Sequence, residues 1–574
     1  MTVTEAQIPI PKLAPYKSKP YDNILEDHNE WPIVKQSANR EAFKAKVVQE
    51  TMHMVKQLAA KRKGLVDELE SVVYMERGRV KNNSWKADPD DEGEFWGKMK
   101  SKLLDLSPLE GEEREQRAEE LLQEVVERYV EEIVGSFNYN AYKFARRFLT
   151  FGFARLLNSA RIKKFGALFR GTLTLQDKIN LVGQTEHIRK LAKKGTVVLV
   201  PTHFSNLDSI LVGWAIQALG LPPFIYGAGL NLFTIQLLSY FMNNLGAYKV
   251  DRRKKNLVYL ETLKMYSNQA IQDGCHSLFF PGGTRSRSGQ IEQQLKLGLL
   301  STAIAAQRHH FQETKEGEAP PKIFVVPVVI NYHFVLEAPS LIKEYLKRQG
   351  QERYYVENDE YSSSYKIATF MLRFIRKGSD ISVSFGRGMD LLGNYVDDEG
   401  TSFDKSGRPI DLREYFTSSG EVTVDRQREG EYTRMLGERI VEEYYKVNRV
   451  FASHLVAFVA FQMMRRMHEH LDLYDLLRLP NEELVLDYQE FRAEVDRLRQ
   501  VIFERYHAKQ LDLAPHMIWD LDKLIDHGLD NVGMYHAARP LLKNRQGNIT
   551  TKDLDTLFFY HNRLMGYGFE KLFR

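Results

Sequence analysis

The chain has 574 residues, of which 43% are hydrophobic, so it is long enough for several domains with filled cores and does not have the composition of a disordered protein. Its 80 basic and 76 acidic residues nearly balance to a net charge of +4, which gives no global signal for nucleic-acid binding. Cys275 is the only cysteine, which excludes an internal disulfide framework and a cysteine-rich metal site and suits a reducing compartment such as the cytoplasm.

The first part of the chain is predicted to be helical. Residues 1–17 contain no apolar core segment, so we expect no signal peptide. Residues 38–76 and 108–134 are rich in Glu, Lys, Arg, Ala and Leu, with apolar positions at helical spacing. We therefore expect a helical N-terminal region over residues 1–135.

The segment NAYKFARRFLTFGFARLL, residues 140–157, has the pattern of a helix at a membrane interface. It places Lys143, Arg146 and Arg147 on one side of a helix, with aromatic and leucine side chains around the rest. A helix packed on the domain core with its arginines in water explains the pattern equally well. We expect peripheral attachment to a membrane surface.

Residues 136–410 have a different texture, with short β-branched runs that close on Pro or Gly and alternate with helical patterns. This is typical of βα units, and it predicts an α/β fold with a mostly parallel sheet flanked by helices. In such sheets, ligands bind beyond the carboxyl ends of the strands. The expected strands cover residues 196–200, 224–226, 248–250, 277–280, 323–330 and 381–385, and the expected helices cover residues 208–219, 257–273 and 294–308.

Residues 411–574 lack strand signals and are predicted to form a helical C-terminal region. Within it, Val450–Met464 is the most apolar stretch of the chain, but it is only 15 residues long and contains polar side chains. A membrane span needs about 18 or more apolar residues, so a buried helix is expected. The expected helices cover residues 432–465, 481–508 and 518–526.

The stretch PTHFSNLDS, residues 201–209, follows a buried strand and places His203 and Asp208 five positions apart. Five residues of a continuous helix turn about 500 degrees, so the two side chains would not share a helical face. A helix that starts near Ser205 could bring them together. Either Asp208 caps that helix with Ser205, or it holds the Nδ1 proton of His203 and leaves Nε2 to take a proton from a hydroxyl.

The stretch FFPGGTRSRSG, residues 279–289, also follows a predicted buried strand. Its glycines, including Gly283, let backbone amides approach an oxyanion, and Arg285 and Arg287 can clamp a phosphate from two sides. It is neither a Walker loop nor a G-x-G-x-x-G loop. We interpret it as an anion site, with a solvated basic turn as the alternative.

The stretch GAYKVDRRKK, residues 246–255, ends a predicted strand with four consecutive cations. Such a run is usually a solvated face or a weak contact with anionic lipid. Arg252 lies closest to the strand end, so we expect it to join the anion site. Lys296, in LKLGLLS, could extend the same positive site.

Together these residues resemble the glycerolipid acyltransferase family, whose mark is H-x4-D followed by three further blocks. HFSNLD resembles the first block, GAYKVDR the second, FPGGTRS the third and VVPVVINYHFVLE, with Pro327 at its centre, the fourth. The phrases GLPPFIYGAGLNLF, RSRSG and SVSFGRGMDL are most similar to glycerol-3-phosphate acyltransferases of the bacterial membrane-associated type. The resemblance covers roughly residues 165–395.

The resemblance implies a role for each site residue. His203 would be the general base for a glycerol hydroxyl, and Asp208 would orient it. The acyl donor would be a thioester of coenzyme A or acyl carrier protein, with no metal or prosthetic group. The partners would be this thioester, glycerol 3-phosphate and the cytoplasmic face of a membrane, without nucleic acid. The acceptor phosphate would be held by Arg252, Gly283, Arg285, Arg287 and Lys296.

One position departs from the family pattern, since Gly282 replaces the usual glutamate of the third block. Some plastid-type glycerol-3-phosphate acyltransferases also lack this glutamate, so the change does not imply an inactive protein. It leaves the acceptor open between glycerol 3-phosphate, lysophosphatidate and dihydroxyacetone phosphate. A catalytically silent lipid-binding or scaffold protein is the alternative from another class. A metal hydrolase using His203, Asp208 and His276 would lack the usual ligand spacing.

Overall fold

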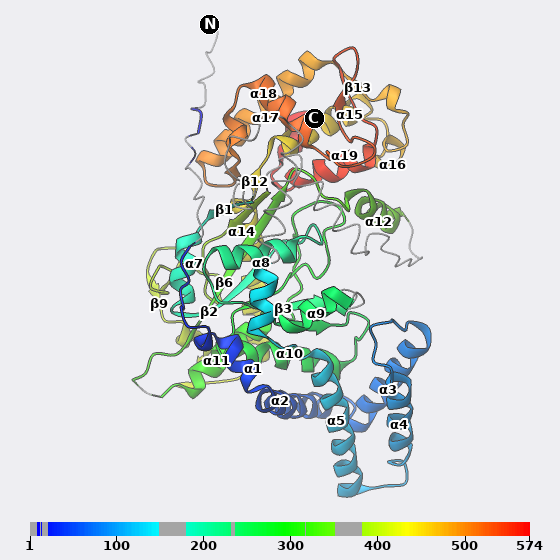
Figure 1. Cartoon of the computed structure of the whole chain (residues 1–574), viewed down its shortest axis with the longest axis vertical. Coiled ribbons are helices and arrows are strands. Elements are labelled where there is room, and N and C mark those ends of the chain that lie inside the picture. Colours follow the sequence, from blue (N-terminus) through cyan, green and yellow to red (C-terminus); the bar gives the residue numbers. More distant parts are fainter. Residues whose placement is uncertain are drawn as a thin grey trace.

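The computed structural model describes residues 9–11, 13, 21–147, 179–230, 236–315, 317–350 and 381–574. In this part of the chain a seven-stranded sheet lies at the centre, with the strand order β1-β7-β6-β2-β5-β3-β4 (Figure 1). The strands are β1 (Ile179–Gly183), β2 (Gly195–Pro201), β3 (Ile225–Gly229), β4 (Ala247–Val250), β5 (Ser277–Leu278), β6 (Lys322–Tyr332) and β7 (Ile381–Phe385).

The sheet is mostly parallel, which confirms the predicted α/β fold class. Only the β6–β7 pair runs antiparallel among the strands of this sheet that the structure describes. Strands β2 and β6 pair over the full length of β2, and nearly every residue of both is buried. Burial on both faces explains why these strands appear in the sequence as continuous apolar runs.

Helices cover both faces of the sheet, and two details differ from the prediction. The expected helix at residues 294–308 begins only at Leu300, because residues 294–299 form an irregular segment. The edge strand β1 was not predicted; its residues are only partly buried and give a weak pattern. The helices are α7 (Thr185–Ala192), α8 (Asp208–Ala218), α9 (Gln236–Asn244), α10 (Leu257–Gln272), α11 (Leu300–Glu313) and α12 (Ala338–Gly350).

The N-terminal region is helical, as predicted, and lies at the bottom of the molecule in Figure 1. Its helices form a second hydrophobic cluster that includes Tyr259 and Tyr266 of α10. The N-terminal region therefore packs directly on the helix that follows β4. Its main helices are α2 (Arg40–Ala60), α3 (Leu65–Asn82), α4 (Glu92–Leu104) and α5 (Gly111–Ile133).

The C-terminal region is also helical; its helices after residue 450 lie at the top of Figure 1, whereas the helix at Arg426–Val447 lies beside the sheet. The expected helix at residues 432–465 is wrong in one respect, because it is broken by the short strand β12 (Arg449–Val450). The apolar candidate segment lies in α15, where Ala452 to Met464 are all buried. No helix in the described ranges is long and apolar enough to cross a membrane. The main helices are α14 (Arg426–Val447), α15 (Ala452–Met467), α17 (Tyr488–His507), α18 (Leu521–Asn531) and α19 (Leu554–His561).

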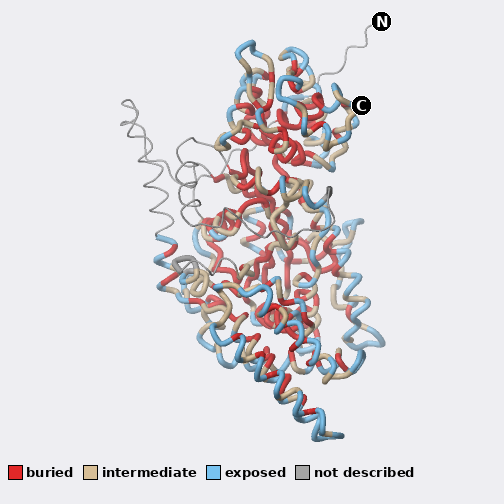
Figure 2. The backbone as a smooth tube through the Cα atoms, turned by 90° about the vertical axis from the view of Figure 1, so that its right-hand side faces the viewer, coloured by how far each residue is buried: buried red, intermediate tan, exposed pale blue. Residues whose placement is uncertain are grey.

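One hydrophobic cluster runs from the sheet into the C-terminal helices. Figure 2 shows buried backbone continuing between these two parts of the molecule. One predicted segment lies outside the described residues, namely residues 148–157 of the predicted interfacial helix. The residues before this gap, 139–147, are helical, and Phe144 among them is exposed.

Candidate active site

The turn between β2 and α8 brings His203 and Asp208 together. Nδ1 of His203 lies 2.8 Å from Oδ2 of Asp208, whose side chain is fully buried. The same oxygen accepts the backbone N–H groups of Phe204 at 2.6 Å and Ser205 at 2.9 Å. The helix begins at Asp208 rather than near Ser205. Capping contacts accompany the histidine contact, because Asp208 accepts the Ser205 N–H and Oγ of Ser205 accepts the Leu207 N–H at 3.2 Å.

Surrounding contacts fix the imidazole of His203. An ionised Asp208 can only accept, so in the neutral ring the tautomer that fits this contact has its proton on Nδ1 and leaves the lone pair on Nε2. The ring stacks on Phe280, with centroids 4.2 Å apart, and the other oxygen of Asp208 accepts the hydroxyl of Tyr332. Asp208 is therefore held in place by groups other than the imidazole, as an orienting carboxylate must be.

Two further carboxylates contact this turn, that of the buried Glu337 and that of the partly buried Glu292, and the sequence analysis missed both. Oε1 of Glu292 accepts the backbone N–H of His203 at 2.8 Å, and Oε1 of Glu337 accepts that of Asn206 at 2.9 Å. Burial raises the pKa of Glu292 to about 7 and also raises the pKa of Glu337. Glu337 is the last residue of the fourth sequence block, so its place in the site could have been predicted from the sequence. No motif marks Glu292.

The loop at residues 279–289, here called the arginine loop, contacts the turn at residues 202–207, here called the histidine turn. The backbone N–H of Ser286 donates to the backbone carbonyl of His203 at 2.7 Å. Arg285 and Arg287, the sequence neighbours of Ser286, therefore flank this contact with the backbone of His203. Arg285 lies 3.5 Å from Glu337, and Arg287 forms a 2.8 Å ion pair with Glu344 of α12. Both arginines thus lie at the carboxyl end of the sheet, where ligands of α/β proteins bind.

Gly283 allows Lys296 to pack across this loop. Gly283 has a φ of +74°, and a Cβ atom there would lie 2.6 Å from Cδ of Lys296. Any side chain would therefore strain the backbone and displace the lysine. The backbone N–H of Lys296 also donates to the carbonyl of Pro281 at 2.7 Å, which fixes its position.

The predicted phosphate-binding cations gather in one neighbourhood. The pKa of Lys296 is lowered by its burial and by the positive charges of Arg252, Arg287 and Lys255. Like charges held this close repel one another, and a bound anion relieves that repulsion. The electrostatics thus favour a phosphate at the point where the arginine loop, the end of β4 and Lys296 meet.

The other two cations after β4 are not a solvated face, which corrects that interpretation of the four-cation run. Arg253 binds Asp88 and Asp251 at 3.1 and 2.7 Å and lies 4.1 Å above the ring of Trp85. Lys254 is buried and pairs with Glu132 of α5 at 2.5 Å. These contacts join the N-terminal helices to the segment that carries Arg252.

The C-terminal region also enters the site. The guanidinium of Arg563 lies 3.8 Å from the ring centroid of Phe204 and donates to the carbonyl of Ile330 at 2.8 Å. Burial lowers the pKa of Arg563 to about 10. Asn562 beside it donates to the carbonyl of Ser288 in the arginine loop at 2.9 Å. No sequence signal linked these residues to the motifs.

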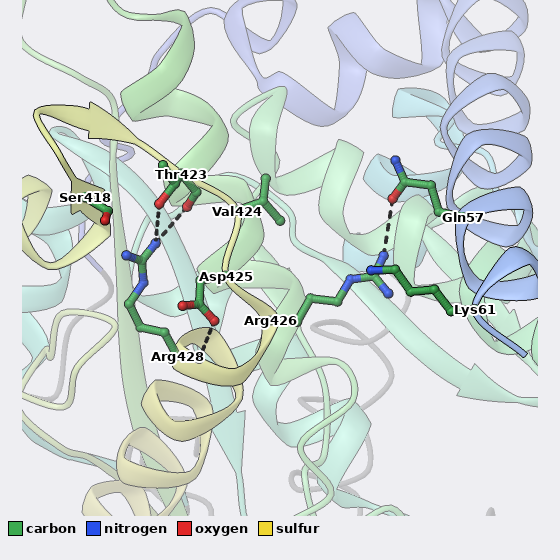
Figure 3. Close-up of a pocket in the computed structure, with 8 residues that line it drawn as sticks. All are labelled: Gln57, Lys61, Ser418, Thr423, Val424, Asp425, Arg426 and Arg428. Atoms are coloured by element: carbon green, nitrogen blue, oxygen red, sulfur yellow. Dashed lines mark hydrogen bonds between the residues drawn. The ribbon is translucent and has the colours of Figure 1, made fainter.

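A separate pocket of about 390 Å³ lies between the end of α2 and the start of α14 (Figure 3). Arg426 reaches toward Gln57, and Arg428 donates to the carbonyl of Thr423 at 2.7 Å. Its lining contains cations and one carboxylate that caps α14, but no base paired with an orienting group. The pairing of a histidine with a buried carboxylate that is found after β2 has no counterpart among the residues that line this pocket.

Three histidines in the described residues, His333, His516 and His527, have ring nitrogens within 4.8 Å of one another. Burial lowers the pKa of each, so the rings are neutral. Nε2 of His516 accepts the backbone N–H of Ala452 at 2.9 Å, which leaves its proton on Nδ1. At most two of the rings then offer a lone pair, which falls short of the three or four protein ligands of a zinc site.

Comparison with known proteins shows what this part of the chain is similar to. Residues 181–331 match the family model described as Acyltransferase. A glycerol-3-phosphate acyltransferase of Aeromonas hydrophila is 24% identical over 426 residues, which cover 71% of this chain and 47% of that protein. One from Pasteurella multocida is 27% identical over 284 residues, and one from Actinobacillus succinogenes is 26% identical over 339 residues. These cover 49% and 57% of this chain, and 30% and 36% of those proteins.

The chain thus spans less than half the length of these relatives. The crystal structure of a 1-acyl-sn-glycerophosphate acyltransferase from Thermotoga maritima is 14% identical, with a TM-score of 0.23. That match covers 53% of this chain and 92% of the other. Residues 181–331 of this chain are thus similar to the acyltransferase family model, and the chain is similar over part of its length to bacterial glycerol-3-phosphate acyltransferases.

Proposed function

We propose that the protein transfers a fatty acyl group from an acyl thioester to a hydroxyl of glycerol 3-phosphate, which gives lysophosphatidate for phospholipid synthesis. The observation that carries this proposal is the hydrogen bond from the Ser286 N–H to the His203 carbonyl. It joins the candidate base to the arginine loop, so one small acceptor can meet both. The names of the relatives support glycerol 3-phosphate as that acceptor.

The geometry suits direct transfer to the acceptor. Nε2 of His203 takes the hydroxyl proton while the hydroxyl oxygen attacks the thioester carbonyl carbon. Asp208 accepts the Nδ1–H at 2.8 Å and stabilises the imidazolium that forms. When the carbon–sulfur bond breaks, the imidazolium returns the proton to the leaving thiolate. The acyl donor is a thioester of coenzyme A or of acyl carrier protein. The step uses no metal or prosthetic group.

The cations would hold the acceptor by its phosphate. Arg252, Arg285, Arg287 and Lys296 would bind the phosphate oxygens, with Gly283 keeping the loop close. Arg287 now pairs with Glu344, and a phosphate with two negative charges competes well for a guanidinium. Lysophosphatidate and dihydroxyacetone phosphate also combine a phosphate with a hydroxyl, so they are the alternative acceptors.

We also propose that the protein attaches peripherally to the cytoplasmic face of a membrane, where its product would enter the bilayer. Lys143, Phe144 and Arg147 are exposed on the helix at residues 139–147, which supports this idea. Flotation with anionic vesicles at low salt tests it. A protein that stays at the bottom of the gradient under these conditions would contradict the proposal.

An acceptor panel tests the activity. The purified protein is incubated with one labelled acyl-coenzyme A, or with the matching acyl carrier protein, and each of the three acceptors. We expect free thiol and labelled lysophosphatidate only when glycerol 3-phosphate is present. Thiol release that does not depend on any acceptor would indicate a thioesterase, and no release with any donor would favour the silent scaffold.

A further inference from the structure

Glu292 occupies the space next to Gly282, the position at which the third block usually carries glutamate. A Cβ atom on Gly282 would lie 3.0 Å from Cγ and 3.2 Å from Oε1 of Glu292. The side chain of Glu292 therefore fills the volume into which a side chain at residue 282 would extend. The third block lacks a carboxylate at residue 282, but the carboxylate of Glu292 lies in the same space.

The carboxylate of Glu292 binds the backbone at the start of the histidine turn. Its Oε1 accepts the N–H of His203 at 2.8 Å. The next two N–H groups of the turn bind Asp208, and the N–H of Asn206 binds Glu337. Three carboxylates thus hold four successive N–H groups, and Glu292 is the one that holds His203 itself.

The second oxygen of Glu292 gives this group a further property. Oε2 is buried and has no hydrogen-bond partner among the described residues. Since Oε1 accepts an N–H, the proton taken up by this carboxyl group lies on Oε2. Burial is the main cause that raises the pKa of Glu292 to about 7, while nearby Arg563 opposes it and Asp208 adds to it. Its charge therefore changes in the neutral range, beside the candidate base.

We propose that Glu292 supplies the carboxylate that the third block lacks at Gly282, and that it acts as a positioning residue which holds the backbone of His203 for proton transfer. The proposal rests on the proposed function for its catalytic part. Its structural part, that a carboxylate at either position can hold the same N–H group, stands on the geometry alone.

The backbone allows the two positions to be exchanged. Gly283 has a φ of +74°, but Gly282 lies outside the left-handed region, so glutamate at residue 282 meets no backbone strain. The clash would come only from the Glu292 side chain, and Glu292→Ala removes it. The Cβ position at residue 282 lies 3.2 Å from the present Oε1, which is within the span of a glutamate side chain.

The test moves the carboxylate from one position to the other. Glu292→Ala leaves the His203 N–H without its acceptor, and we expect kcat to fall about 10- to 150-fold, the equivalent of a charged hydrogen bond. The Michaelis constant for glycerol 3-phosphate should change less than about threefold, since no phosphate contact is removed. The double variant Gly282→Glu/Glu292→Ala should recover at least about tenfold of the lost kcat. Gln294→Ala, exposed and close in sequence, is the matched control.

The conservative variant separates charge from shape. Glu292→Gln keeps an oxygen for the His203 N–H and should retain most of kcat, but its pH profile should lose the inflection near pH 7 that belongs to the carboxyl group. A role limited to stability would leave the pH profile unchanged in shape. A melting temperature close to that of the parent protein confirms that each variant is folded.

A readout without turnover keeps the two proposals distinguishable. The rate at which diethyl pyrocarbonate modifies His203, followed by peptide mass spectrometry, should rise in Glu292→Ala and return to the parent rate in the double variant. If the parent transfers no acyl group while this pattern holds, only the proposed function fails. If kcat and the modification rate are unchanged in Glu292→Ala, or the double variant recovers neither, the role of Glu292 is overturned.

Discussion

His203 is presented by groups that do not depend on the substrate. Asp208 accepts two backbone N–H groups and the hydroxyl of Tyr332 as well as the imidazole, so its orientation is fixed before a ligand arrives. The stacked ring of Phe280 limits rotation of the imidazole. Pre-orientation of this kind lowers the cost of reaching the transition state.

Replacing His203 should therefore abolish most of the turnover without unfolding the protein. Removal of a well-placed general base commonly costs about 100- to 10,000-fold in rate, and we expect His203→Ala to lie in this range. Steady-state kinetics with glycerol 3-phosphate measures it, with the exposed His470→Ala as control. A loss smaller than about tenfold would contradict the assigned role.

Loss of a phosphate contact should appear in acceptor binding instead. For Arg287→Ala we expect the Michaelis constant for glycerol 3-phosphate to rise about 10- to 150-fold, since a charged hydrogen bond contributes about 1.5 to 3 kcal/mol. The Michaelis constant for the thioester should change little. Arg408→Ala, which removes an exposed arginine outside the site, is the control. An equal rise for the thioester would argue against a phosphate role.

The sequence could predict only some residues of the site. His203, Asp208 and the arginines lie in short motifs directly after strands, where local pattern and chemistry agree. Glu292 and Arg563 reach the turn through the folded chain, and neither has a neighbour in sequence that marks its role. Contacts of this kind depend on tertiary packing, which a local pattern cannot encode.

At the level of elements, the strands buried on both faces were the easiest to predict. β2 and β6 are continuous apolar runs that end on Pro201 and Tyr332, whereas the partly buried edge strand β1 has no such pattern. The break between α14 and α15 was missed because apolar spacing continues through it, and the pairing of β12 with β14 (Asp512–Leu513) creates it. The end of this helix is therefore set by a long-range strand pairing, which the local periodicity of the sequence does not reveal.

The arginine loop packs directly against α19. Gly289 has a φ of +83°, and a Cβ atom there would lie 2.2 Å from the carbonyl oxygen of Phe559. Gly289→Ala should therefore push α19 away from the loop, at a cost of about 1 to 3 kcal/mol, and lower both the melting temperature and kcat. Thermal unfolding and kinetics measure the two effects.

Gly298→Ala is the matched control for this variant, since a Cβ atom there has nothing within 4 Å and Gly298 has no positive φ. It should leave the melting temperature and turnover close to those of the parent. If Gly289→Ala were as stable and active as Gly298→Ala, the contact between the loop and α19 would not matter for the site.

On the scale of the whole molecule, all three predicted parts contribute to one site. The division at residues 1–135, 136–410 and 411–574 stays a prediction, but the contacts cross it. Arg253 and Lys254 bind the N-terminal helices beside Arg252, and Arg563 contacts the histidine turn. The helical ends therefore have a physical reason to influence the proposed acyl transfer.

Buried neutral histidines should make the protein sensitive to acid. Burial lowers the pKa of His276 and His536 to about 4 and of His454 and His561 to about 3. Unfolded histidines bind protons below about pH 6.5, so the free energy of unfolding should fall as the pH drops from about 6.5, by up to about 1.4 kcal/mol per pH unit for each ring. Carboxyl groups with raised pKa, such as Glu292, oppose part of this loss.

Melting temperatures at pH 7.5, 6.5 and 5.5, at about constant ionic strength, measure this dependence. His276→Asn should flatten it, because the amide oxygen can still accept the Val197 N–H that Nδ1 accepts now. The exposed His470→Asn should leave the dependence as steep as in the parent. An unchanged or higher melting temperature at pH 5.5 would contradict the expectation.

The position of Arg563 beneath Phe204 has a consequence for biosynthesis. During translation, His203 and the arginine loop leave the ribosome hundreds of residues before Arg563 is made. The nascent chain therefore exposes an incomplete site, in which Phe204 lacks the contact with the guanidinium of Arg563. The proposed acyl transfer should therefore begin only once Arg563 has been made and has packed against Phe204.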